Sequence, residues 1–184
     1  DHRDLHSFPT RRSSDLIRRL GNLRRYMPWT SALAIIASLA MAGIPLLNGF
    51  LSKEMFYTEA LALDGHHWMR RAVAVAALLY GVFGVAYSLR FVYETFFGDG
   101  PHGLGARLPH EPPRWMKIPV EVLVVLCVAV GVFPALTVAP VLHAGAAAIL
   151  GDALPDYSLA VWHGVNAPLL MSLAGIVGGV ALYF

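Results

Sequence analysis

An uncharged run interrupted by helix-breaking residues places the strongest limit on what this chain can fold into. The run covers Trp29–Ser52, and Lys53 follows it directly. A helix of this length rises about 1.5 Å per residue and is long enough to cross a hydrocarbon core about 30 Å thick. Within the run lie Gly43, Pro45 and Gly49. Because proline removes a backbone donor and glycine tolerates unwound backbone, the sequence predicts a membrane helix with a break or hinge at these three residues.

The charge at Lys53 lies close to this break. Irregular backbone at membrane depth persists only where protein or a water-filled cavity satisfies it, and an ionisable residue there is expected to be functional. Burial disfavours a charged ammonium and a nearby carboxylate favours it, so a lysine in this setting can take up and release a proton. The alternatives are that Lys53 extends to an interface or caps the first half of the broken helix.

Composition favours a membrane protein over a soluble one. Hydrophobic residues make up 57% of the 184 residues and charged residues 14%, against about 45–50% and about 25% in soluble domains. A net charge of +2, with arginines spread over separate loops, gives no support for nucleic-acid binding. The single Cys127 excludes an internal disulfide framework. We therefore expect an all-α, polytopic bundle of membrane helices in the lipid bilayer.

The first sixteen residues, DHRDLHSFPTRRSSDL, differ from the rest of the chain. They have no initiator Met, no apolar stretch of signal-peptide length and no helical periodicity. Their sequence resembles a translated sequencing-adapter read-through, so we expect residues 1–16 to be non-native. A short cytoplasmic linker is the alternative. With an apolar run at the other end as well, we expect the chain to be an internal fragment of a longer protein.

Four spans are expected, the first of them the discontinuous helix. Their approximate ranges are Met27–Leu63, Ala72–Phe97, Ile118–Leu142 and Val165–Phe184. Pro134 is expected to kink the third span. The segment before the first span and the loop 98–117 are rich in Arg and Lys, whereas the loop after the third span carries only acidic charges. The positive-inside rule therefore places the N-terminal side of the first span in the cytoplasm.

Several short segments resemble one membrane-protein family. Met41–Glu54, which reads MAGIPLLNGFLSKE, is similar to the broken-helix signature of antiporter-like membrane subunits. These subunits occur in respiratory complex I, in hydrogenase-linked relatives and in Mrp-type cation/proton antiporters. Within the family, SKEMFY (Ser52–Tyr57), YSLRF (Tyr87–Phe91) and LAVWHGVN (Leu159–Asn166) resemble the A subunits of Mrp-type antiporters.

The resemblance implies how the chain is divided and where it works. Residues 17–164 would be the C-terminal part of the antiporter-like membrane domain, and residues 165–184 would begin a further, truncated span. The expected location is a bacterial plasma membrane. The expected partners are the other membrane subunits of a multisubunit antiporter complex.

The resemblance also implies a transport activity, the exchange of Na⁺ or another monovalent cation for H⁺ driven by the proton gradient. The lysine of the family motif belongs to a chain of buried charged groups and water that passes protons, and this role transfers to Lys53. Glu54 is a second relay candidate, with the alternative that it lies near a half-helix start or faces another subunit. Two other functions stay open at this point. One is a proton-pumping subunit of complex I, and the other is a membrane scaffold without an ion path.

The remaining charged residues give weaker indications. Arg90 and Glu94 are spaced i,i+4 and share a helix face, so we expect an ion pair on the inner side, with a cytoplasmic entry for protons or cations as the alternative. No histidine pair lies at matching depth within the spans to hold a haem, and no spacing matches a zinc site. His163 has no role that the residues explain. Without a nucleophile triad, cofactor loop or metal set, we expect a transporter subunit with no cofactor rather than an enzyme.

Overall fold

Every regular element in the described part of the chain is a helix. The computed structural model describes residues 21–99, 109–151 and 164–184. The expectation of an all-α fold is therefore confirmed for these ranges. Residues 1–16 and His163 lie outside the described residues.

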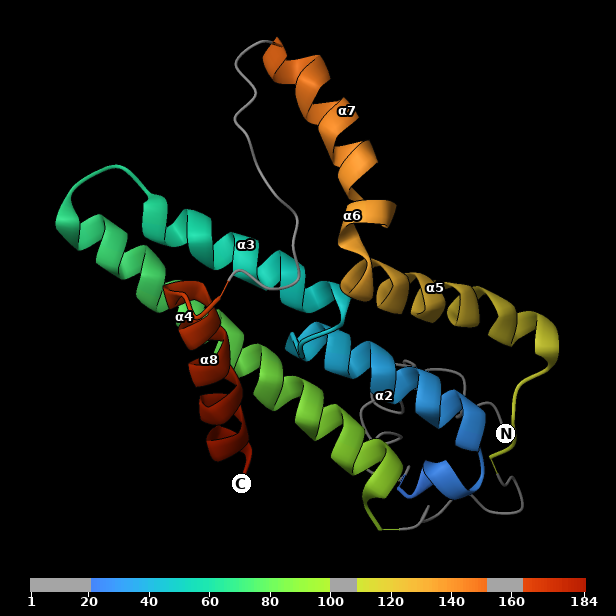
Figure 1. The fold of residues 1–184 in the computed structure, drawn as a ribbon. Coiled ribbons are helices and arrows are strands. Elements are labelled where there is room, and N and C mark those ends of the chain that lie inside the picture. The colour runs from blue at the N-terminus through green and yellow to red at the C-terminus, as the bar shows by residue number, and fades with distance from the viewer. Residues whose placement is uncertain (1–20, 100–108, 152–163) are drawn as a thin grey trace, which may run out of the picture.

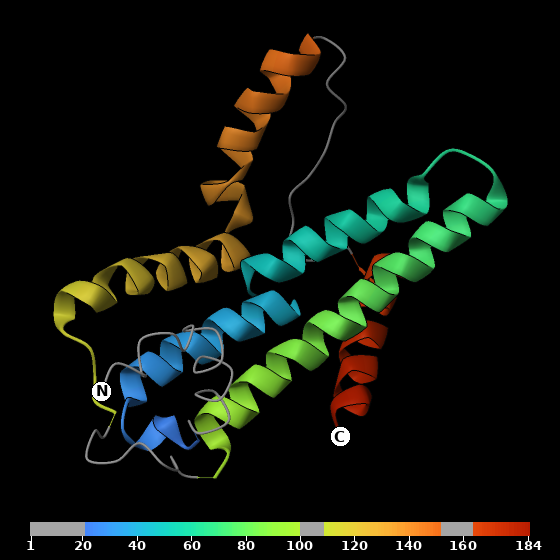
Figure 2. The same cartoon turned by 180° about the vertical axis from the view of Figure 1, so that it is seen from behind.

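The first span is discontinuous, as the sequence predicts. After a short 3-10 helix η1 (Leu23–Arg25), α2 covers Pro28–Ala42 and α3 covers Asn48–Ala62. Figures 1 and 2 show α2 and α3 following one another while the long helix α4 (His67–Val92) returns beside both. A π-helical turn, η2 (Tyr93–Phe97), extends α4. The two half-helices thus both pack along α4, which is continuous over His67–Val92.

The break between α2 and α3 begins as a glycine-terminated helix end. Gly43 adopts a left-handed conformation with φ 78°. Its N–H donates to the Ala40 carbonyl over 3.0 Å, and the N–H of Ile44 donates to the Leu39 carbonyl over 3.1 Å. This pattern of bonds closes a helix at a glycine and satisfies carbonyls that the helix leaves free. Leu46 also has a positive φ, 73°, which is costly for a residue with a branched side chain.

Small residues let the last helix pack closely on α4. Helix α8 covers Ala167–Tyr183, and its buried face includes Gly175 and Gly179. A Cβ built at Gly175 would lie 3.6 Å from the backbone of Gly81, and one at Gly179 would lie 2.5 Å from Cβ of Val85. The backbones of α4 and α8 therefore approach one another as small-residue helix pairs do in membranes.

The third expected span differs from the prediction. Helix α5 (Arg114–Val132) ends before Pro134, the short helix α6 (Pro134–Thr137) follows, and α7 (Ala139–Leu150) leaves at a steep angle to α5. Phe133, the residue before the proline, has the non-helical angles φ −124° and ψ 57°. A residue that precedes proline is pushed out of the helical region, because the proline ring clashes with its backbone. The expectation of one kinked helix over Ile118–Leu142 is therefore wrong, and the helix breaks.

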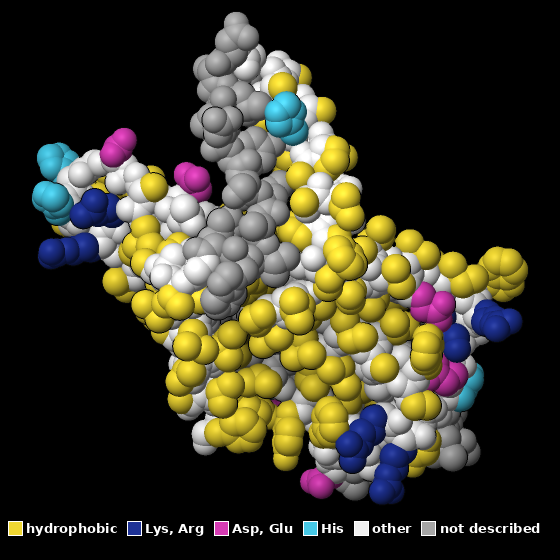
Figure 3. All heavy atoms as spheres, viewed as in Figure 1, with side chains coloured by type: hydrophobic (Ala, Val, Ile, Leu, Met, Phe, Trp, Pro, Cys, Tyr) yellow, Lys and Arg dark blue, Asp and Glu magenta, His cyan; other side chains and the backbone are white. Residues whose placement is uncertain are grey.

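Two of the described helices are long and apolar enough to cross a membrane alone. These are His67–Phe97, which includes η2, and Arg114–Val132. Three shorter apolar helices accompany them, at Pro28–Ala42, Ala139–Ile149 and Ala167–Tyr183. The total of four spans stays a prediction. Figure 3 shows hydrophobic side chains over the middle of the visible face, with charged side chains gathered toward opposite ends, as expected for a protein surrounded by lipid.

Candidate functional site at the helix break

Lys53 lies in the second turn of α3 and points back toward the end of α2. Its ammonium donates a hydrogen bond to the carbonyl oxygen of Ala42, the last residue of α2, over 2.7 Å. The residue is buried, with 9% of its surface exposed. A Cβ built at Gly43 would lie 3.0 Å from the Lys53 nitrogen, so the absence of a side chain at Gly43 makes room for the lysine.

The end of α2 provides an electrostatic partner for this ammonium. The last carbonyls of a helix carry a partial negative charge, and a cation near them is stabilised. The turn at Gly43 already satisfies the carbonyls of Leu39 and Ala40, and Lys53 satisfies that of Ala42. Among the described residues, no carboxylate lies within ion-pair distance of Lys53. In this geometry the charge of Lys53 is balanced by a helix end rather than by an acid.

An open hollow adjoins the lysine. It has a volume of about 310 Å³ and is lined by Ser52, Lys53, Phe56 and Tyr80. On the facing helix α4, a Cβ built at Gly84 would lie 3.8 Å from the Lys53 nitrogen, so this glycine leaves the approach to the ammonium uncrowded. The hollow is large enough for several water molecules and has polar groups that can bind them.

Glu54 faces a different helix. The residue is 7% exposed, and its carboxylate accepts a hydrogen bond from Nδ2 of Asn166 over 3.3 Å. Asn166 is the N-cap of α8, and its Oδ1 accepts from the N–H of Leu169 over 2.9 Å. Adjacent residues on a helix point about 100° apart, which explains why Glu54 and Lys53 have separate partners. The acid lies at the positive start of α8 and the base at the negative end of α2, the favourable choice at each helix end.

Helix α5 packs against the break from a third direction. The Cys127 thiol donates to Oδ1 of Asn48, the first residue of α3, over 2.9 Å. A Cβ built at Gly131 would overlap the carbonyl oxygen of Leu46, and one built at Gly49 would overlap that of Ala40. Protein contacts from α5 and from the two half-helices therefore pack against one side of the non-helical backbone, whereas Pro45 and Leu46 are exposed.

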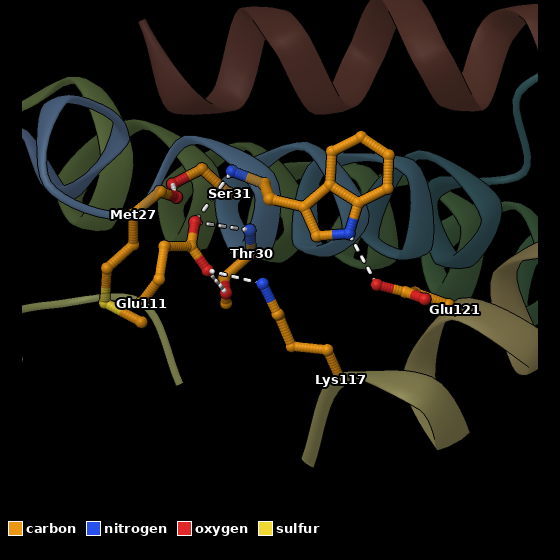
Figure 4. A network of polar contacts seen from close by, with 7 residues as sticks. Met27, Thr30, Ser31, Glu111, Lys117 and Glu121 are labelled. Atoms are coloured by element: carbon orange, nitrogen blue, oxygen red, sulfur yellow. Dashed lines mark hydrogen bonds and ion pairs between the residues drawn. The ribbon is translucent and has the colours of Figure 1, made fainter. Parts of the chain in front are cut away.

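A second polar network ties the starts of α2 and α5 together (Figure 4). Glu111 accepts hydrogen bonds from the backbone N–H of Trp29 (2.8 Å), from the N–H of Thr30 (3.2 Å) and from the Thr30 hydroxyl (2.8 Å). Lys117 lies 3.8 Å from its carboxylate. Indole Nε1 of Trp29 donates to Glu121 over 2.6 Å. Glu111 thus caps α2 from a distant loop, and a carboxylate at a helix start is favourable.

These contacts change the titration of Glu111. Burial raises the pKa of Glu111. The hydrogen bonds from Thr30 and Trp29 and the charge of Lys117 lower it by more than burial raises it, so the pKa lies below the ordinary 4.5. The carboxylate form therefore stabilises the folded state at neutral pH.

Arg90 and Glu94 form an ion pair at the junction of α4 and η2. Nε of Arg90 lies 3.0 Å from Oε1 of Glu94, and the two side chains are 62% and 40% exposed. Nearby, the guanidinium of Arg24 lies 4.6 Å from the ring centre of Phe97, in η2. The pair therefore lies at the surface, at the same end of the structure as η1.

The part of the chain that the structure describes contains no group of three or more His, Cys, Asp or Glu side chains placed to hold a metal ion. The sequence identified Lys53, Glu54 and Gly43 without their partners, whereas it predicted the ion pair of Arg90 with Glu94. No residue pattern indicates that the Ala42 carbonyl would be the partner of Lys53 or that Asn166 would be the partner of Glu54. Only the pattern of an asparagine directly before Ala167-Pro168, a helix start, could have suggested the cap at Asn166.

Comparison with known proteins shows which family the chain resembles. A model of the family described as NADH:quinone oxidoreductase/Mrp antiporter, TM, matches residues 5–81. A probable K(+)/H(+) antiporter subunit from Rhizobium meliloti is 51% identical over 168 residues, which cover 91% of this chain and 17% of that protein. Over about nine tenths of its length, the chain is similar to this antiporter-like family of membrane proteins.

Other antiporter-like proteins are also similar to this chain. An Na(+)/H(+) antiporter subunit from Alkalihalophilus pseudofirmus is 32% identical over 178 residues, covering 91% of this chain and 22% of that protein. The solved structure of the Mrp complex from a Dietzia species matches with a TM-score of 0.73 and 30% identity over 89% of this chain and 17% of that chain. The present chain thus spans about a fifth of the length of its antiporter relatives.

Proposed function

We propose that this chain is part of a membrane subunit that exchanges a monovalent cation for H⁺, and that Lys53 carries a proton along the exchange path. The observation that carries the proposal is the buried ammonium of Lys53, bonded to the end of a broken helix. Relatives named K(+)/H(+) and Na(+)/H(+) antiporter subunits support the exchange of K⁺ or Na⁺. Because these relatives are antiporter subunits, they favour exchange over quinone-driven pumping by a complex I subunit.

The geometry suggests how the lysine works. When Lys53 is protonated, its bond to the Ala42 carbonyl and the negative end of α2 stabilise the charge. A positive charge arriving nearby on the path lowers the affinity of Lys53 for its proton, which then leaves through water in the adjoining hollow. The neutral amine releases the carbonyl and accepts the next proton. Glu54, held by Asn166, is the second proton-binding group of this proposal.

The proposal includes an orientation and partners. The N-terminal side of α2 faces the cytoplasm of a bacterial cell. Basic residues precede the first expected span, at Arg24 and Arg25, and the third, at Arg114 and Lys117, and such residues are enriched on the cytoplasmic side. The other membrane subunits of a multisubunit antiporter complex pack around this one. Exposed hydrophobic side chains along α5 and α7 leave apolar surface for lipid or for those subunits.

The test is ion exchange by the Lys53→Ala variant in the full-length protein, assembled with its complex in inverted membrane vesicles. A pH gradient is imposed, and Na⁺- or K⁺-dependent proton movement is followed with a pH-sensitive dye. Positioned proton-transfer groups contribute about 100-fold or more to rates, so we expect a loss of that size. The matched control is Lys117→Ala, at the only other lysine of the chain. Wild-type exchange by Lys53→Ala would favour the membrane scaffold without an ion path.

A further inference from the structure

An open hollow lies between the starts of α2 and α5, at the end of α2 that is remote from the helix break. It has a volume of about 640 Å³ and is lined by Trp29 of α2 and by Arg114, Trp115, Lys117, Ile118 and Glu121 of α5. The two tryptophans are 54% and 84% exposed. Indole rings favour the headgroup level of a bilayer, because they combine an apolar body with a polar N–H. The hollow is therefore expected at the depth of the lipid headgroups.

Arg114 is a cation of this hollow that has no acidic partner within the described part of the chain. Lys117, by contrast, lies 3.8 Å from the carboxylate of Glu111. Glu121 accepts a hydrogen bond from the indole N–H of Trp29 (Figure 4). A guanidinium keeps its charge at physiological pH, and its planar set of donors matches the oxygens of a phosphate group. Arg114 is thus free to bind an anionic group.

Glu121 also lines the hollow, so its negative charge has to be compared with the attraction of Arg114. The two residues are about 10 Å apart along α5 at 1.5 Å per residue. Coulomb energy falls with distance, and salt screens charges over about 8 Å at physiological ionic strength. A phosphate in contact with Arg114 is therefore attracted by the arginine more strongly than it is repelled by Glu121. A lipid with a net negative charge gains this attraction in full, whereas the ammonium of a zwitterionic headgroup cancels part of it.

An apolar stripe on α5 runs from the hollow toward the middle of the helix. It consists of Trp115, Ile118, Val122 and Val125, whose spacings of three or four residues place them on one side of the helix. The last three are 42%, 52% and 66% exposed. Between the first and the last residue the helix rises about 15 Å, which is about half of a hydrocarbon core of about 30 Å. The apolar stripe thus has the length of one lipid leaflet, and a soluble phosphate compound would leave it uncovered.

We propose that this hollow binds an anionic phospholipid of the surrounding membrane. The phosphate contacts Arg114, the rest of the headgroup region lies beside Trp29 and Trp115, and an acyl chain covers the apolar stripe. Basic pockets beside membrane helices bind anionic headgroups through the same combination of charge and apolar surface. This binding site is separate from the exchange proposed for Lys53 and does not depend on it.

The site is tested by photo-crosslinking in the full-length complex, reconstituted into nanodiscs of phosphatidylcholine. The probe is phosphatidylglycerol with a diazirine in its acyl chain, and labelled residues are located by mass spectrometry. We expect label on the apolar stripe between Ile118 and Val125. Phosphatidylcholine with the same diazirine chain is expected to label this segment about fivefold less, the equivalent of about 1 kcal/mol for one basic residue at a membrane surface.

Variants of Arg114 connect the label to the guanidinium. Arg114→Ala is expected to lower labelling of the apolar stripe by phosphatidylglycerol about fivefold. Arg114→Lys keeps the charge but not the planar set of donors, and it is expected to restore part of the labelling. The control is Arg71→Ala, which removes an exposed arginine at the start of α4 and is expected to leave the labelling unchanged. Figure 1 shows the start of α4 on the opposite side of the molecule from the start of α5.

Two results would overturn the inference. An apolar stripe without label would mean that protein covers this face of α5 in the assembled complex. Equal labelling by both lipids, unchanged in Arg114→Ala, would mean that the stripe meets bulk lipid without selecting a headgroup.

Discussion

Replacing Gly43 by alanine tests whether the helix break and the Lys53 contact form one unit. An alanine at φ 78° costs about 1–2 kcal/mol, because its Cβ crowds the following carbonyl. The same Cβ would lie 2.5 Å from Cδ and 3.0 Å from Nζ of Lys53, so the lysine has to move away from the Ala42 carbonyl. Losing a hydrogen bond from a charged donor costs about 1.5–3 kcal/mol.

These terms give the expected size of the effect. Alanine also reduces the conformational entropy of the unfolded chain, and this offsets about 0.5–1 kcal/mol of the destabilisation. We therefore expect Gly43→Ala to lower the free energy of unfolding by about 2–4 kcal/mol. The assay is equilibrium unfolding of the full-length protein in mixed micelles with increasing SDS, followed by circular dichroism.

The matched control makes the same chemical change where the structure leaves space. Gly145 lies within α7, and a Cβ built there has no atom within 4 Å. Gly145→Ala is expected to raise stability by about 0.5–1 kcal/mol, since glycine is a poor helix former. If Gly43→Ala were as stable as the wild type, or if both variants shifted stability equally, the coupling between Gly43 and Lys53 would be refuted.

Three further predictions concern the surroundings of the break. Glu111→Ala removes the cap of α2 and is expected to cost about 1 kcal/mol in equilibrium unfolding at pH 7. Because the folded pKa of Glu111 lies below the ordinary 4.5, this contribution is complete above pH 4.5 and is lost as the pH falls through the lowered value, so variant and wild type converge in acid. Gly131→Ala places a Cβ against the backbone of Leu46 and is expected to cost about 1–3 kcal/mol, and an unchanged unfolding midpoint would contradict that packing. A double-mutant cycle on the exposed pair Arg90 and Glu94 is expected to give a coupling of at most about 0.5 kcal/mol, and a coupling above about 2 kcal/mol would mean that the pair is buried in the assembled protein.

The sequence predicts the break because its cause is local. Gly43 supplies the left-handed conformation that ends α2, and Pro45 has no N–H with which to continue it, so both half-helices could be located from residue types alone. Pro134 shows the limit of the same reasoning. A proline within a span either kinks or ends a helix, and the choice at Phe133 depends on packing that the sequence does not specify.

The partners of the site depend on tertiary structure and could not be predicted. Lys53 binds a backbone carbonyl eleven residues earlier, and any residue type could have supplied that oxygen. Asn166 reaches Glu54 from 112 residues away, and Glu111 caps α2 from 81 residues away.

The central claim is that Lys53 exchanges a proton rather than only capping a helix, and Lys53→Arg tests it most directly. Arginine keeps the charge and can donate to the Ala42 carbonyl, but it does not lose its proton in proteins. In vesicles that hold the assembled full-length complex, we predict folding and assembly like the wild type together with exchange as low as in Lys53→Ala. Exchange restored to the wild-type rate by arginine would mean that Lys53 serves only to close α2, and the proton-carrying role would be wrong.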